Sequence, residues 1–108
     1  MSNTAEKSNT SFQDLVNSEK PVVIDFYADW CGPCRAFAPQ LDKFKAEQGD
    51  KIRVVKIDVD RNPEISQALQ IRSIPTIMIY QNGEQKYRQA GAPPISALRS
   101  EVESLLTA

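Results

Sequence analysis

The chain contains three stretches in which β-branched and aromatic residues predominate, at positions 22–27, 52–59 and 76–80. The first and third are apolar almost without interruption, which is typical of strands buried on both faces of a sheet. Pro21 opens the first stretch, and Ile74-Pro75 leads into the third. We therefore predict three strands of one sheet.

Apolar residues also recur at helical spacing after the two cysteines. Phe37, Leu41 and Phe44 lie at i, i+4 and i+7, which predicts one buried helix face. Gly49 is expected to end this helix, because glycine readily adopts the conformations found at helix ends. Pro39 lies inside the helix and is expected to kink it.

Three shorter helices are predicted where apolar positions follow residues that favour helix starts. Ser11, Asn62-Pro63 and Pro93-Pro94 supply these starts. The apolar positions of the three helices are, in chain order, Phe12, Leu15 and Val16, then Ile65, Ala68 and Leu69, and finally Ile95, Leu98, Val102 and Leu105.

Asn82-Gly83 is a tight-turn dipeptide, so residues 84–90 are predicted to fold back as an antiparallel edge strand. Strands that alternate with helices along the chain predict an α/β domain whose parallel portion is covered on both faces. We expect this single domain to span residues 11–108. Residues 1–10 are rich in Ser, Asn and Thr and are expected to form a flexible leader.

Composition excludes several kinds of partner. A chain of 108 residues, 41% of them apolar, can build one core without a structural disulfide or metal. Thirteen basic and fourteen acidic residues, with no block of either sign, disfavour binding to nucleic acid or an anionic membrane. No apolar run approaches the roughly 18 residues of a membrane span, and no secretory signal is evident. We expect a cytoplasmic monomer without a cofactor.

The chemistry of the chain is concentrated in Cys31-Gly32-Pro33-Cys34, since there are two cysteines and no histidine. Without histidine, Cys/His and Ser/His catalytic pairs are excluded. The motif joins a buried strand to a helix, where free N–H groups and the helix dipole stabilise a thiolate. A pKa lowered towards roughly 7 would make Cys31 an effective nucleophile. Cys34, one turn later and more deeply buried, would then resolve the mixed disulfide.

Two other interpretations of the cysteine pair are open. The cysteines could be inert core residues, although Trp30, Gly32 and Pro33 place this loop at a surface. The pair could also be half of a zinc site completed by a second chain, since a single chain supplies too few ligands. We favour redox chemistry and expect no metal site within one chain.

Asp25 is the other informative residue of this region. It lies among Val22, Val23, Ile24 and Phe26, so its carboxylate should be desolvated and its pKa raised. The alternative is a solvated aspartate at the end of a strand.

Taken together, these residues resemble the thioredoxin family. The resemblance rests on Trp30-Cys31-Gly32-Pro33-Cys34 following Ile24-Asp25-Phe26, and it extends from Phe12 to the carboxyl end. It continues in Lys56-Ile57-Asp58, Asn62-Pro63, Ile74-Pro75-Thr76, Asn82-Gly83 and Gly91-Ala92. It implies the thioredoxin fold, a mixed sheet of four to five strands flanked by helices on both faces. The fifth strand would fall on residues 4–8, whose pattern is so weakly apolar that we expect it to be weak or absent.

The resemblance also implies roles for individual residues. Asp25 would be the acid/base that moves the proton of Cys34, with Lys56 moderating it. Ile74-Pro75 would be a cis bond packed against the dithiol, and the Ile74 backbone would pair with an extended substrate. An apolar rim around Cys31 would bind substrate; its residues are Trp30, Gly32, Pro33, Ile74, Pro75, Gly91 and Ala92.

The function implied is a general protein-disulfide reductase that acts on disulfide-containing proteins and is recharged by a thioredoxin reductase. Two alternatives are open, because one fold can serve several functions. The chain could be a redox-silent subunit that binds a partner through the same rim, or an oxidant or isomerase. Arg35 could assist the thiolate or only solubilise the rim, and the sequence does not decide between these.

Overall fold

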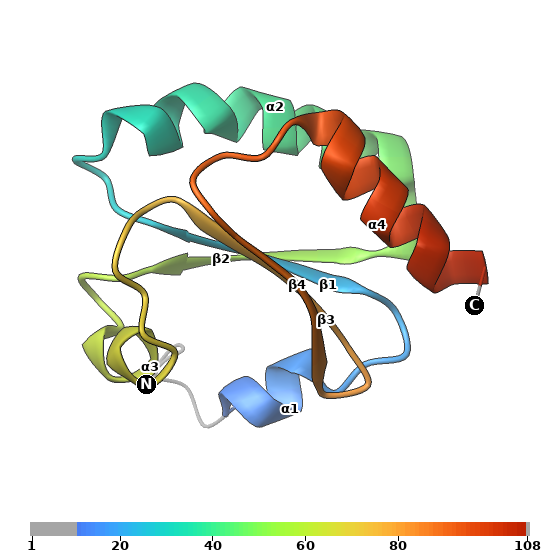
Figure 1. Cartoon of the computed structure of the whole chain (residues 1–108), viewed down its shortest axis with the longest axis horizontal. Coiled ribbons are helices and arrows are strands. Elements are labelled where there is room, and N and C mark those ends of the chain that lie inside the picture. Colours follow the sequence, from blue (N-terminus) through green and yellow to red (C-terminus); the bar gives the residue numbers. More distant parts are fainter. Residues whose placement is uncertain (1–10, 108) are drawn as a thin grey trace.

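The structure, a computed structural model, describes residues 11–107, which form a four-stranded sheet flanked by helices (Figure 1). The strand order is β2-β1-β3-β4. The strands are β1 (Val22–Tyr27), β2 (Arg53–Asp58), β3 (Thr76–Gln81) and β4 (Glu84–Ala90). The helices are α1 (Phe12–Val16), α2 (Gly32–Gln48), α3 (Pro63–Ala68) and α4 (Ile95–Thr107), and a short 3-10 turn (Gly49–Lys51) follows α2.

The sheet is mixed, as expected. β1 pairs in parallel with β2, because the chain returns along α2 before it enters β2. The β1–β3 and β3–β4 pairs are antiparallel, so the parallel portion is limited to one pair of strands. Asn82 and Gly83 have φ angles of 54° and 80°, the positive values that a tight hairpin turn requires.

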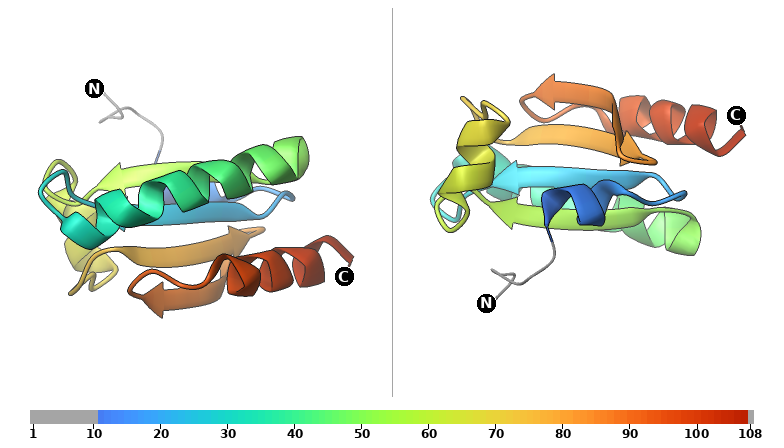
Figure 2. Two further views of the ribbon diagram at one scale, coloured as in Figure 1. Left: turned by 90° about the horizontal axis from the view of Figure 1, so that it is seen from above. Right: turned by 90° about the horizontal axis from the view of Figure 1, so that it is seen from below.

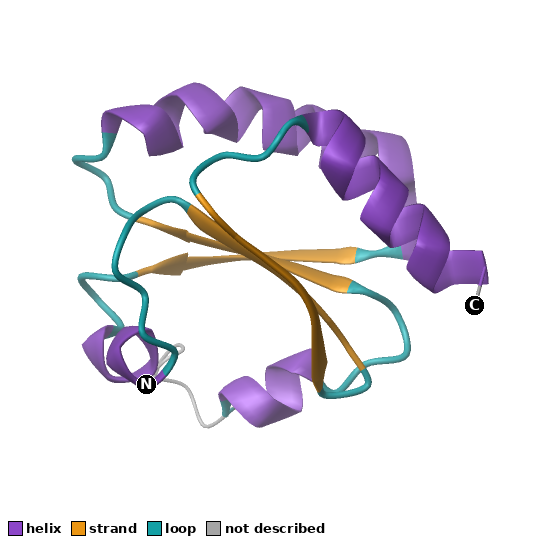
Figure 3. Ribbon diagram, in the orientation of Figure 1, coloured by secondary structure: helices purple, strands orange, loops and turns teal. Residues whose placement is uncertain are grey.

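Side chains of β1 alternate between two cores on opposite faces of the sheet. Val23 packs with buried residues of α2 and α4, whereas Val22, Ile24 and Phe26 pack towards the face that carries α1. Figure 2 shows α2 and α4 over one face and α1 and α3 over the other, and Figure 3 shows the same two layers of helices around the strands. Because strand side chains alternate, Asp25 shares the α2 face with Val23.

The predicted elements are present, with small differences at their ends. The second strand begins at Arg53 and ends at Asp58, although Ile52 is buried in the core below α2. α2 continues without a break through Pro39. Within residues 11–107, no helix combines the length and apolar character that crossing a membrane requires. The leader (1–10) and the fifth strand considered for residues 4–8 lie outside the described residues.

α4 offers a matched test of the core, since Leu98 is fully buried and Leu106 is exposed. Leu98→Ala should lower the free energy of unfolding by about 2–5 kcal/mol, because it removes apolar contacts and leaves a cavity. Leu106→Ala should change it by about 0.5 kcal/mol or less. Denaturant melts of both variants check this, and equal losses would contradict the packing of α4 described here.

Candidate active site

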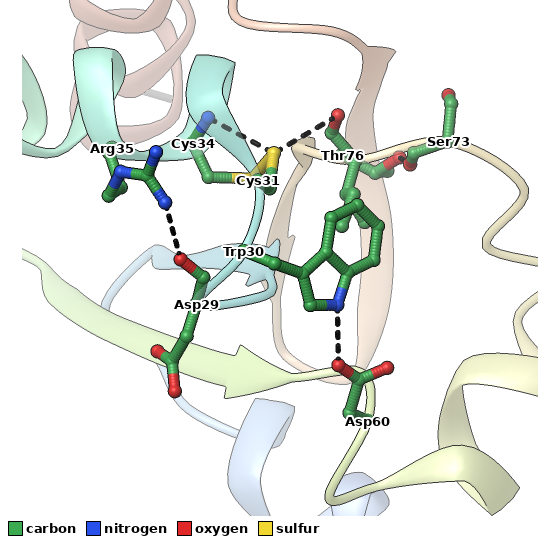
Figure 4. Close-up of a disulfide and its surroundings, with 9 residues drawn as sticks. Asp29, Trp30, Cys31, Cys34, Arg35, Asp60, Ser73 and Thr76 are labelled. Carbon is green, nitrogen blue, oxygen red and sulfur yellow. Dashed lines mark hydrogen bonds between the residues drawn. A yellow bond between two sulfur atoms is a disulfide. The ribbon is translucent and has the colours of Figure 1, made fainter.

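Cys31 is the N-cap residue of α2. Its Sγ accepts the backbone N–H of Cys34 at 3.2 Å, which satisfies one of the free donors of the first helical turn (Figure 4). Pro33 lies in the same turn, where it supplies no N–H that would need a partner. Cys31 and Cys34 form a disulfide, and their Cα atoms are 5.3 Å apart.

Both cysteines are buried to the same degree. Each is 4% exposed, so the expectation that Cys34 is the more deeply buried of the two does not hold for this disulfide form. The first turn of α2 places the two sulfurs side by side, so the residues around them cover both. Ala28 and Ile74 pack against the pair.

The segment before β3 lies directly against the dithiol. The Ile74 carbonyl oxygen is 3.7 Å from Cys31 Sγ, and the Ile74-Pro75 bond is cis, as the family resemblance implied. The Thr76 hydroxyl donates to the Ser73 carbonyl at 2.6 Å, which closes this turn. The Gly91 N–H donates to the Pro75 carbonyl at 2.7 Å, so the end of β4 is tied to the same place.

Trp30 is a strongly exposed residue of the rim. Its side chain is 67% exposed, and its indole Nε1 donates to Asp60 Oδ2 at 2.7 Å. Asp60 follows β2, and nothing in the sequence pattern connected it to Trp30. Of the other rim residues, Gly32, Pro33 and Ala92 are exposed, Ile74 and Gly91 are half-buried, and Pro75 is buried. The structure therefore joins Ile74, Pro75 and Gly91 beside Cys31, while Trp30 is held by a separate contact.

Asp25 is buried, which excludes the solvated alternative. It is 1% exposed, and its Oδ1 makes no hydrogen bond within the described residues. Burial raises the pKa of Asp25 from 3.8 to about 6, and the positive charge of Lys56 opposes this rise. Lys56 is the partner of Asp25 in the β1–β2 register, and its Nζ lies 5.0 Å from the centre of the Tyr27 ring.

A cleft of about 150 Å³ lies beside both this carboxylate and Cys34. It is lined by Asp25, Tyr27, Ala28, Asp29, Cys34, Arg35, Ala38 and Lys56. Arg35 Nη1 donates to the Asp29 carbonyl at 2.7 Å, so this side chain fixes the loop before α2 (Figure 4). The cleft brings together Asp25, Cys34 and Lys56, the three residues to which the family resemblance assigned proton transfer.

The described residues also bear on the zinc interpretation. Among residues 11–107, no three His, Cys, Asp or Glu side chains gather as a metal site would require. The two sulfurs that would form half of a shared zinc site are bonded to each other.

Comparison with known proteins agrees with the geometry. The sequence profile of the thioredoxin family matches residues 3–104. Thioredoxin from Synechocystis sp. is 43% identical over 107 residues, which cover 98% of this chain and all of that protein. The bifunctional thioredoxin reductase/thioredoxin of Mycobacterium leprae is 40% identical over 95% of this chain, and the match covers 23% of that longer protein. The oxidised mitochondrial thioredoxin 3 of Saccharomyces cerevisiae has a TM-score of 0.76 at 34% identity, and the match covers 86% of each chain.

A mixed sheet with a bonded cysteine pair at the start of a helix defines a thiol–disulfide oxidoreductase that reduces protein disulfides. The chain belongs to the thioredoxin family.

The raised pKa of Asp25 predicts a pH-dependent gain in stability for Asp25→Asn. An acid whose pKa is higher in the folded state stabilises the fold when protonated, and this contribution is lost as pH rises through the folded pKa. A rise from 3.8 to about 6 corresponds to roughly 3 kcal/mol at 1.36 kcal/mol per pH unit. The stability of Asp25→Asn relative to the parent should therefore increase between about pH 4 and 6 and stay level above.

Denaturant melts of the oxidised proteins from pH 4 to 8 measure this difference. Asp42→Asn serves as the control. Asp42 is an exposed residue of α2, so this substitution removes a carboxylate that is not buried. An Asp25→Asn protein less stable than the parent at pH 7 to 8 would contradict the assignment.

Proposed function

We propose that Cys31 is the attacking sulfur and Cys34 the resolving sulfur of a general protein-disulfide reductase. The observation that carries this assignment is the position of Cys31 at the N-cap of α2, where its Sγ accepts the N–H of Cys34. A thiolate at that atom is stabilised by the same N–H and by the helix dipole. Cys34 lies inside the first turn of α2 and is not the N-cap residue.

The reaction has two exchange steps. The Cys31 thiolate attacks one sulfur of a substrate disulfide, and the other substrate sulfur leaves as a thiolate. Cys34 then loses its proton to Asp25 and attacks Cys31 Sγ, which releases the second substrate sulfur as a thiolate. Two electrons pass from the dithiol to the substrate, the two released thiolates take up protons, and the protein is left with the Cys31–Cys34 disulfide.

Substrate binding is assigned to the apolar rim. The carbonyl of Ile74, beside Cys31 Sγ, is a hydrogen-bond acceptor for the backbone of an extended polypeptide. Trp30 and Pro33, within two residues of Cys31 in the chain, are exposed and offer apolar contacts. Backbone pairing combined with apolar burial demands little of the substrate sequence, which suits a reductase that acts on many proteins.

The electron donor that fits this role is a thioredoxin reductase. The Mycobacterium leprae relative supports this choice, because its name joins a thioredoxin reductase and a thioredoxin in one protein. We further propose that the chain works as a cytoplasmic monomer with one domain over residues 11–108.

Single cysteine variants distinguish the two sulfurs. Cys34→Ser should still attack a disulfide substrate and accumulate as a mixed disulfide through Cys31, because no second sulfur resolves it. Cys31→Ser should form less of this adduct by roughly tenfold or more, because the activated thiolate is lost. Mass spectrometry of each variant mixed with an oxidised protein substrate measures the adduct.

The reverse pattern, with adduct on Cys34 only, would overturn the assignment. The double variant Cys31→Ser/Cys34→Ser is the control, and it should neither form an adduct nor reduce the substrate. If this double variant retained full biological activity, the redox-silent binding function would replace the reductase.

A further inference from the structure

The buried carboxylate of Asp25 faces a space in which its free oxygen can be hydrated. Oδ1 makes no hydrogen bond to any described residue, although Asp25 is almost completely buried. A buried polar atom without a partner is costly, and in most proteins such atoms bond to protein or ordered water. The adjoining cleft of about 150 Å³ far exceeds the roughly 10–15 Å³ that one water needs. Lys56 and Arg35 supply polar groups on its walls.

The same cleft is the route by which protons reach and leave Asp25. Cys34 and Asp25 both line it, so a water inside it can contact both groups. Each catalytic cycle loads one proton onto Asp25 and must return it to solvent. Because the side chain itself is 1% exposed, that return depends on the cleft being open.

Ala38 is placed to control how open the cleft is. It lies four residues after Cys34 on α2, so both side chains project from the same face of the helix. Ala38 lines the cleft and is half-buried, so any larger side chain there would extend into the space before Asp25. Another part of the wall is held in place, because Arg35 Nη1 donates to the Asp29 carbonyl.

We propose that Ala38 is a positioning residue whose small side chain keeps the cleft wide enough for water to connect Cys34, Asp25 and the solvent. The inference rests on the proposed role of Asp25 in resolution. In that step the Cys34 thiol gives its proton to a cleft water, and this water passes a proton to Asp25 Oδ1. Cys34 becomes the attacking thiolate and Asp25 becomes neutral. Asp25 later returns the proton to solvent through the same cleft, so no atom is consumed.

The test compares Ala38→Leu with Ala36→Leu. Ala36 is an exposed residue of the same helix that does not line the cleft, so it is the matched control. Rapid-mixing experiments with a disulfide substrate separate the attack by Cys31 from the decay of the mixed disulfide. Ala38→Leu should slow the decay about tenfold or more at pH 7, part of the 10²–10⁴-fold that general acid–base catalysis contributes. Attack by Cys31 should change less than about twofold, and Ala36→Leu should resemble the parent.

A second readout separates hydration from a purely structural effect. Filling the cleft should raise the pKa of Asp25, because the larger side chain removes water from the carboxylate. The pKa is measured from the carboxyl carbon NMR signal of Asp25 as a function of pH. Ala38→Ser, which keeps the side chain small and polar, should recover most of the resolution rate. If Ala38→Leu folds poorly in denaturant melts, the comparison of Ala38→Val with Ala38→Ser replaces it.

Three outcomes overturn the inference: resolution by the larger variants at the parent rate, equal slowing of both exchange steps, or an unchanged pKa of Asp25. Asp25→Asn distinguishes these from failure of the proposed function. If Asp25→Asn resolves as fast as the parent, the role of Asp25 is wrong. If Asp25→Asn is slow but Ala38→Leu is not, only the role of Ala38 is wrong.

Discussion

At the start of α2, the Sγ of Cys31 accepts the backbone N–H of Cys34, and this hydrogen bond holds the sulfur at the N-cap of the helix. The sheet determines what surrounds that point. α2 begins just beyond the carboxyl end of β1, and β3 runs antiparallel to β1 with Phe26 opposite Thr76. The segment that leads into β3 therefore arrives beside the sulfur and brings the Ile74 carbonyl within 3.7 Å. The position of the rim residues beside Cys31 therefore depends on the order and direction of the strands as well as on the residues themselves.

The alternation of side chains along β1 adds the second half of the site. Val23 and Asp25 both face α2, yet one contributes to the core and the other is a carboxylate without a hydrogen bond. Burial raises the pKa of Asp25, and Lys56 on the neighbouring strand limits the rise. A buried acid lowers stability when it is ionised, and groups with such perturbed pKa values cluster at functional sites.

Local patterns were sufficient to predict much of this arrangement. Continuous apolar runs predicted the buried strands, and the spacing of Phe37, Leu41 and Phe44 predicted the buried face of α2, because both signals arise from the periodicity of one element. The position of Asp25 inside such a run predicted its burial. The cis bond before Pro75 came only from the family resemblance, since the local sequence fits a trans bond as well.

Contacts between distant segments were not predictable in the same way. The bond from Trp30 to Asp60 joins a loop to the end of another strand. The bond from Arg35 to the Asp29 carbonyl, and the cleft beside Ala38, depend on how a loop turns before a helix. Neither periodicity nor composition carries that information. The alternation of strands and helices indicated parallel strands, whereas β3 runs antiparallel to β1, because the chain enters β3 at the edge of the sheet where β2 ends.

The reduction potential of the Cys31–Cys34 pair decides whether the protein donates electrons to protein disulfides or withdraws them from protein thiols. It is measured by equilibrating the protein with dithiol buffers of known potential and determining the fraction of the protein that carries the disulfide. A reductase of this family should have a potential of roughly −270 mV, the value typical of thioredoxins, at which the dithiol donates electrons to protein disulfides of higher potential. A value near roughly −120 mV, typical of strong oxidants of protein thiols, would contradict the reductase assignment, because the pair would then draw electrons from its targets.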